Sequence, residues 1–233
     1  MKIVTWNCCL KLASKYELVT SLKPDVLIIQ ECEKLPSNFF SDAEYHWVGH
    51  NDRKGLGILT FGETAKIDMS FNDKLDYFLP LNLSSGQKIL GVWSFTHRAE
   101  KRFGEGHKGH VSDALDYYQD WLNDSDSAII CGDFNNSVIW DKGSKPSNFS
   151  STHQKLEALG FYSAYHKLRG ESFGQESESS LYHTKNQAKP YHIDYLYLKN
   201  IKAQNLEIGK YEDWIGLSDH MPLSLDCSTD IPD

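Results

Sequence analysis

Hydrophobic positions along the chain form short segments of two kinds. Residues 2–6, 25–30 and 127–131 are continuously apolar and rich in β-branched side chains, which is typical of buried strands. Residues 90–96 and 193–198 alternate more between apolar and polar positions, as half-exposed or sandwiched strands do. The pattern therefore predicts strands that are spread over nearly the whole chain.

Apolar positions with helical spacing lie between these strands. One set covers residues 12–22 and stops before Pro24, which cannot continue a helix. A second set covers residues 115–122. Alternation of strands and helices predicts a layered α/β architecture.

A third predicted helix has the clearest boundaries. Ser151 followed by Gln154 matches a capping box, and Gly160 is typical of the residue that ends a helix. The polar residues 98–109 and 170–190 are expected to form surface loops, the first because it is also rich in glycine.

Composition indicates one folded domain over residues 1–233. Hydrophobic residues are 40% of the chain and no linker-like tract divides it. The longest aliphatic run, residues 26–29, is far shorter than the ~20 residues needed to cross a bilayer. The five cysteines show no C-x-x-C spacing, so neither a disulfide framework nor a zinc ribbon is expected. We expect a monomeric cytoplasmic protein with no membrane partner.

The charge balance limits the function classes. The chain has 24 Lys and Arg against 32 Asp and Glu, a net charge of −8. Because such a chain has no global field that attracts polyanions, non-specific coating of nucleic acid is excluded. The charge does not exclude an enzyme that binds a phosphate locally through a metal ion.

Polar side chains follow several of the predicted strands. Ligands bind beyond the strand ends in open α/β sheets, so these side chains are expected to converge. Each alone fits an ordinary turn or a solvated loop, and only their order and context suggest a shared site. They are Asn7, Glu31, Asp133, Asn135, Asp219 and His220.

Five short motifs contain these residues and occur in order between positions 5 and 222. They are Thr5-Trp6-Asn7, the strand from Asp25 to Gln30-Glu31, Gly132-Asp133-Phe134-Asn135, His192-Ile193-Asp194-Tyr195 and Ser218-Asp219-His220-Met221-Pro222. Together they resemble the endonuclease/exonuclease/phosphatase superfamily, which has the deoxyribonuclease-I-like fold, and within it a small bacterial branch. The resemblance implies a four-layered α/β sandwich of two mixed β-sheets flanked by helices, with the site at one edge.

The resemblance also implies a metal site. Glu31 would bind a divalent cation, with Asn7 and Asp219 near it. Oxygen ligands suit Mg²⁺ or Mn²⁺ rather than zinc, whose structural sites favour Cys and His.

Catalytic roles follow from the same resemblance. Asp133 would orient and deprotonate the attacking water, and Asn135 would hold that water or donate to a phosphate oxygen. His220, oriented by Asp194, would stabilise charge on the phosphate, because a carboxylate partner favours the imidazolium. His97 falls where the family places a residue that reaches the scissile phosphate.

The remaining histidines are expected at the surface or in supporting positions, with His107 and His110 as weaker candidates for substrate contact. Tyr191 lies where abasic-site enzymes often carry an aromatic residue, but residues 182–183 do not supply the aromatic pair expected there. Abasic-site specificity is therefore not predicted.

The sequence favours a metal-dependent phosphodiesterase, a nuclease acting on DNA or RNA. The alternative is a phosphatase or phosphodiesterase for a small phosphorylated molecule or a lipid headgroup, which the acidic charge favours. A catalytically silent binding module of the same fold is the weakest hypothesis, because every proposed acidic and amide group is present.

Overall fold

Two six-stranded sheets form the centre of the molecule. The structure is a computed structural model that describes residues 1–95 and 99–229, so His97 lies outside the described residues. The first sheet has the order β13-β14-β1-β2-β4-β3. Its strands are β1 (Lys2–Asn7), β2 (Val26–Cys32), β3 (Ala43–Asn51), β4 (Lys54–Phe61), β13 (Lys202–Ile208) and β14 (Leu223–Ser228).

The second sheet has the order β5-β6-β7-β8-β12-β9, and β10 and β11 form a separate pair. Its strands are β5 (Ala65–Ile67), β6 (Phe78–Leu83), β7 (Lys88–Trp93), β8 (Ala128–Asp133), β9 (Tyr162–Ser163) and β12 (Asp194–Lys199), and the pair consists of β10 (Leu181–Tyr182) and β11 (Pro190–Tyr191). Both large sheets are mixed, because β1–β2 and β7–β8 are parallel and the other pairs are antiparallel.

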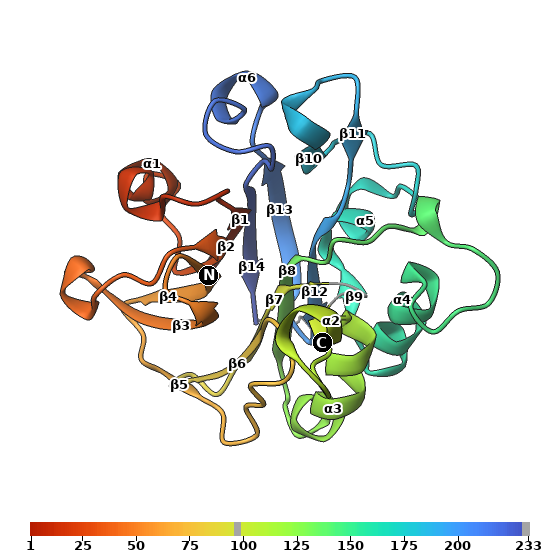
Figure 1. Cartoon of the computed structure of the whole chain (residues 1–233), viewed down its shortest axis with the longest axis horizontal. Helices are drawn as coiled ribbons and strands as arrows, with labels where there is room; N and C mark the ends of the chain where they lie inside the picture. Colours follow the sequence, from red (N-terminus) through yellow and green to blue (C-terminus); the bar gives the residue numbers. More distant parts are fainter. Residues whose placement is uncertain (96–98, 230–233) are drawn as a thin grey trace.

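Helices cover the outer faces of the two sheets. Figure 1 shows the sheets in the middle of the molecule, with α1 on one side and α3 and α4 on the other. The helices are α1 (Tyr16–Thr20), α2 (Ala99–Phe103), α3 (Val111–Asn123), α4 (Phe149–Ala158), α5 (Ala164–Arg169) and α6 (Tyr211–Trp214). In the part of the chain that the structure describes, short 3₁₀ turns lie at Leu12–Ser14, Ser37–Phe39, Val138–Trp140 and His183–Lys185.

Strand alternation explains why the apolar runs are continuous. Ile3 and Ile28 point between the two sheets, whereas Val4 and Leu27 pack on the outer face beneath α1 and α6. Because both faces of each central strand are covered, most positions are apolar, and the buried polar Thr5 and Gln30 are joined by a hydrogen bond from Gln30 Nε2 to Thr5 Oγ1. The predicted four-layered sandwich of two mixed β-sheets flanked by helices is confirmed.

Two local expectations are wrong. The first turn of α4 begins three residues before the predicted capping box: its N-cap is Asn148, and the Asp141 carboxylate accepts hydrogen bonds from the N–H groups of Phe149 and Ser150, at 2.7 and 2.9 Å. Ser151 therefore lies inside the helix. The segment 98–109 was expected to be a loop, but it contains the helix α2. Gly160 does end α4, with φ of +84°.

Segment 170–190 is only partly a loop, because it contributes β10 and reaches β11. Four of the five unpaired cysteines are buried, whereas Cys9 is exposed. No helix in the described part of the chain has the length and apolar character that a membrane span requires. The single domain over residues 1–233, the monomer and the cytoplasmic location stay predictions.

Candidate active site

The strand ends place three of the predicted residues together. Asn7 ends β1, Asp133 ends β8, and Asp194 begins β12 directly opposite Asp133 in the antiparallel register. β1 and β8 belong to different sheets but face each other across the sandwich. The side chains at these ends therefore meet at one edge of the sandwich.

Gly132 shapes the end of β8. Its φ is +141°, a conformation that side chains rarely adopt, and a Cβ at this position would lie 1.9 Å from the backbone oxygen of Val92. Only glycine allows β7 and β8 to approach this closely where the chain turns into Asp133.

The Asp133 carboxylate is fully buried and accepts three hydrogen bonds. The Asn7 side-chain amide donates to Oδ2 at 3.0 Å. The backbone N–H of Asn135 donates to Oδ1 at 2.8 Å, and its side-chain amide donates to Oδ2 at 3.2 Å. Two amide side chains from separate motifs thus fix one carboxylate.

His220 lies between two carboxylates. Its Nδ1 pairs with Asp194 Oδ2 at 2.9 Å, and its Nε2 lies 3.9 Å from Asp133 Oδ2. Its backbone is also held, because Trp6 Nε1 donates to its carbonyl oxygen and Ser218 Oγ accepts from its N–H. The imidazole is therefore oriented by Asp194 and directed toward Asp133.

Burial and charge shift both titrating groups. Burial lowers the pKa of His220, but the Asp194 and Asp133 carboxylates outweigh it and raise this pKa to about 10. Burial, followed by the charge of Asp194, raises the pKa of Asp133 to about 7, against the opposing effect of His220. At neutral pH the cluster therefore holds an imidazolium beside a carboxyl group poised to exchange a proton.

The charges of Glu31 and Asp219 both act on Cys9. Burial raises the pKa of the Cys9 thiol, and the charges of Glu31 and then Asp219 raise it further. Asn7 Oδ1 accepts a hydrogen bond from the backbone N–H of Cys9 at 3.1 Å, so the amide oxygen also faces Cys9. All three predicted ligands thus act on Cys9, although among the described residues Glu31 and Asp219 join no compact cluster of three metal-binding side chains.

Lys54 was not among the sequence candidates. Its Nζ lies 2.8 Å from Glu31 Oε2, and Glu31 has a φ of +58° where the β2–β4 register shifts between Gln30 and Cys32. No short motif marks Lys54, because only the pairing of β2 with β4 brings it to Glu31. A cation already neutralises this carboxylate.

A cavity of about 300 Å³ borders the cluster of Asp133, Asp194 and His220 at Asn135. Lys142 and Lys145 line it with Trp140, whose ring lies 5.2 Å from that of Tyr191. The other lining residues are His110, Asn136, Asp141, Ser147 and Asn148.

Two of the remaining histidines are buried in supporting positions. His192 is buried, and its Nδ1 lies 3.0 Å from the carbonyl oxygen of Glu178. His166 is also largely buried and pairs with Glu176. Both serve the packing of the loop between α5 and β10, which is a supporting position rather than a surface one.

Solved structures share this architecture over nearly their whole length. A 3'-5' exonuclease (NExo) from Neisseria meningitidis matches with a TM-score of 0.72 and 15% identity, over 98% of this chain and 100% of that one. An AP endonuclease from Archaeoglobus fulgidus matches with a TM-score of 0.66 and 17% identity, over 99% and 100%. The chain has the deoxyribonuclease-I-like fold.

The deoxyribonuclease-I-like fold implied by the five motifs is thereby confirmed. A functionally unknown conserved protein from Enterococcus faecalis also shares it, with a TM-score of 0.61 and 15% identity, over 98% of this chain and 99% of that one. No protein-family model matches the sequence, and no curated protein is significantly similar to it.

Proposed function

We propose that the protein is a divalent-metal-dependent phosphodiesterase that acts as a nuclease. The observation that carries the proposal is the buried cluster of Asp133, Asp194 and His220, fixed by the amides of Asn7 and Asn135. A general base and a cation held within one small space are what hydrolysis of a phosphodiester requires.

Each residue has a defined task in this reaction. Ionised Asp133 accepts a proton from the attacking water, which adds in line to phosphorus. His220, kept as the imidazolium by Asp194, donates to a non-bridging phosphate oxygen. The side-chain amide of Asn135 donates to Asp133 and to the Ser94 carbonyl oxygen, so its task is to hold the base in place beside the water.

Glu31, Asn7 and Asp219 would hold the metal ion. Their donor atoms are oxygens, which fits Mg²⁺ or Mn²⁺, and the ammonium of Lys54 at Glu31 shows that this carboxylate accepts a cationic partner. When bound, the ion supplies a Lewis acid that neutralises charge developing on the phosphate and the leaving oxygen.

DNA is the substrate class that we favour. One solved structure with this fold is titled a 3' phosphatase from Neisseria bound to a product DNA hairpin, and it matches with a TM-score of 0.71 and 15% identity, over 97% of this chain and 98% of that one. In the present chain, Lys142 and Lys145 line the cavity next to Asn135, where they would meet backbone phosphates.

A small phosphorylated molecule is the second candidate. The net charge of −8 supports it, because tight non-specific binding of a long polyanion needs more positive surface than such a chain provides. RNA is the third candidate substrate.

The test is a substrate panel with Mg²⁺ or Mn²⁺. It comprises single-stranded and duplex DNA, a 3'-phosphorylated DNA hairpin, an abasic-site duplex, RNA and small phosphate esters. We expect cleavage of DNA that is lost in Asp133→Asn and His220→Ala. Cleavage of small esters alone would overturn the nuclease proposal, and activity that survives both substitutions would overturn the site.

A further inference from the structure

A second group of metal-binding side chains lies outside the catalytic cluster. His50, Asp76 and His107 each direct one nitrogen or oxygen toward the others, all within 4.8 Å. They come from the end of β3, the segment before β6 and the segment between α2 and α3, so three distant parts of the chain build the group.

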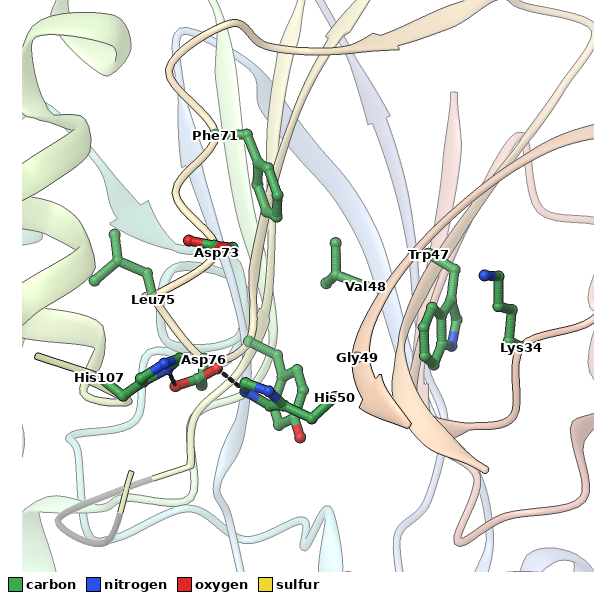
Figure 2. A pocket seen from close by; sticks show the side chains of 11 residues that line it. Lys34, Trp47, Val48, Gly49, His50, Phe71, Asp73, Leu75, Asp76 and His107 are labelled. Atoms are coloured by element: carbon green, nitrogen blue, oxygen red, sulfur yellow. Dashed lines mark hydrogen bonds and ion pairs between the residues drawn. The ribbon is translucent and has the colours of Figure 1, made fainter. Parts of the chain in front are cut away.

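Asp76 is the centre of this group. Its side chain is only 2% exposed, and its two oxygens pair with different imidazoles: Oδ1 with His50 Nε2, and Oδ2 with His107 Nδ1 at 2.8 Å. Figure 2 shows both imidazoles pointing at this carboxylate from opposite sides. Two imidazole nitrogens and a carboxylate oxygen are a ligand set for zinc and other divalent transition metals.

The surrounding structure fixes these three side chains. The Phe103 ring stacks on the His50 imidazole, with centroids 3.8 Å apart and planes at 12°. Backbone hydrogen bonds from Asp76 N to Lys108 O, at 2.8 Å, and from Lys108 N to Lys74 O, at 2.9 Å, join the His107 segment to the Asp76 segment. Prepositioned ligands of this kind reduce the ordering that metal binding would otherwise require.

The group opens into a cavity of about 480 Å³. His50, Asp76 and His107 lie at one end of this cavity, and Phe71, Val48, Trp47 and Lys34 surround the rest (Figure 2). Asp73 lines it as well. The carboxylates of Asp73 and Asp76 and the ammonium of Lys34 therefore face a space that is wide enough for water.

This open side distinguishes the group from a buried hydrogen-bond network. A site with three protein ligands and an open position is the arrangement of zinc ions that keep a water or another exchangeable ligand.

We infer that His50, Asp76 and His107 form a binding site for a divalent transition-metal ion of the zinc type, with its open coordination position facing the 480 Å³ cavity. His50 binds through Nε2, His107 through Nδ1, and Asp76 through a carboxylate oxygen. The inference concerns different residues from the catalytic metal ligands and does not depend on the proposed function.

A series of side-chain contacts links the site to Glu31. Lys54, which pairs with Glu31, lies 5.1 Å from the Trp93 ring centroid, and Trp93 stacks on Tyr77 with centroids 4.6 Å apart. Tyr77 in turn contacts the His50 ring at 5.6 Å. A metal ion here would lie beside the active site rather than within it.

The test measures binding of the metal alone to the full chain after dialysis against a chelator. We expect Zn²⁺ titration calorimetry to show a site that survives Glu31→Gln, while Asp76→Asn and His107→Gln each weaken it at least about 10²-fold. Co²⁺ should give a visible d–d spectrum that disappears in the same variants. Mg²⁺ should not compete, because imidazole ligands do not suit it.

Controls make the outcome decisive. His183→Ala removes an exposed histidine elsewhere and should leave Zn²⁺ binding unchanged. Nitrogen NMR of the histidines should show His50 Nε2 and His107 Nδ1 shifting on addition of Zn²⁺, and circular dichroism checks that each variant is folded. Absence of Zn²⁺ binding by the wild-type chain, or binding that persists in folded Asp76→Asn and His107→Gln, would overturn the inference.

Discussion

Asp133 and Asp76 are both buried carboxylates beside histidine, but their surroundings differ. Asp133 accepts hydrogen bonds from Asn7 and Asn135, and it lies 3.9 Å from the His220 imidazole. Asp76 directs both oxygens to imidazole nitrogens, at the end of an open cavity. We therefore propose that the same two residue types form a base for proton transfer in one place and a ligand set for a cation in the other, depending on what else faces the carboxylate.

Position in the fold explains the difference. Asp133 and Asp194 lie opposite each other on central strands, where both layers of the sandwich enclose them. His50 lies on β3, the edge strand of its sheet, and His107 lies in a segment between helices. Enclosure raises the cost of a bare charge and shifts pKa values, whereas an edge leaves room for an added ligand.

The strongest test of this comparison is neutralisation of Asp133. Asp133→Asn keeps the shape of the side chain but removes the proton acceptor, so kcat should fall by about 10²- to 10⁴-fold. The steady-state rate on the best substrate of the panel measures the loss. Asp124→Asn, at a side chain that is 92% exposed, is the matched control and should retain full activity. A fully active Asp133→Asn would refute the role of this carboxylate.

The orientation of His220 is tested next. Asp194→Asn removes the charge that favours the imidazolium, so the pKa of His220 should fall and the alkaline limit of activity should move to lower pH. We expect a loss of about 10-fold at pH 7 and a larger loss above it. His220→Gln should remove the alkaline limb altogether. If the alkaline limb of the pH profile is unchanged in Asp194→Asn, a group other than His220 causes it.

The expected pH profile of the wild-type protein follows from the same pair. Activity requires ionised Asp133, whose pKa is raised to about 7 by burial and then by Asp194, so the rate should rise as pH passes through about 7. It also requires protonated His220, whose pKa of about 10 sets the fall at high pH. The measurement is kcat/KM against pH at saturating metal. A rate already maximal at pH 5 would contradict a raised pKa for Asp133.

The smallest expected effect concerns Lys54. Its ammonium competes with a metal ion for Glu31, so Lys54→Met should lower the metal concentration needed for half-maximal activity by about 2- to 5-fold, as the energy of a partly exposed ion pair suggests. Metal titration of activity measures this. Lys66→Met, at an exposed position on β5, is the control. If replacing Glu31 changes the metal concentration needed for half-maximal activity less than replacing Asp219 does, the two carboxylates have different roles.

Local sequence determined the strand segments and the positions of the proposed catalytic groups. The apolar runs end in Asn7 and in Gly132-Asp133, and a buried polar side chain needs hydrogen-bond partners, which the end of a strand can offer. His220 and Asp194 were recognisable because each lies in a short motif whose members are neighbours in sequence. These residues also carry the resemblance through which the fold was predicted.

Tertiary structure alone decided the contacts between distant segments. Lys54 reaches Glu31 only through the pairing of β2 with β4, and the cap of α4 comes from Asp141, seven residues before the N-cap. His50, Asp76 and His107 are separated by 26 and 31 residues, so no local pattern links them. The sequence fixes which side chains are available at each strand end, whereas their pKa values and partners depend on burial and distance, which exist only once the sheets have packed.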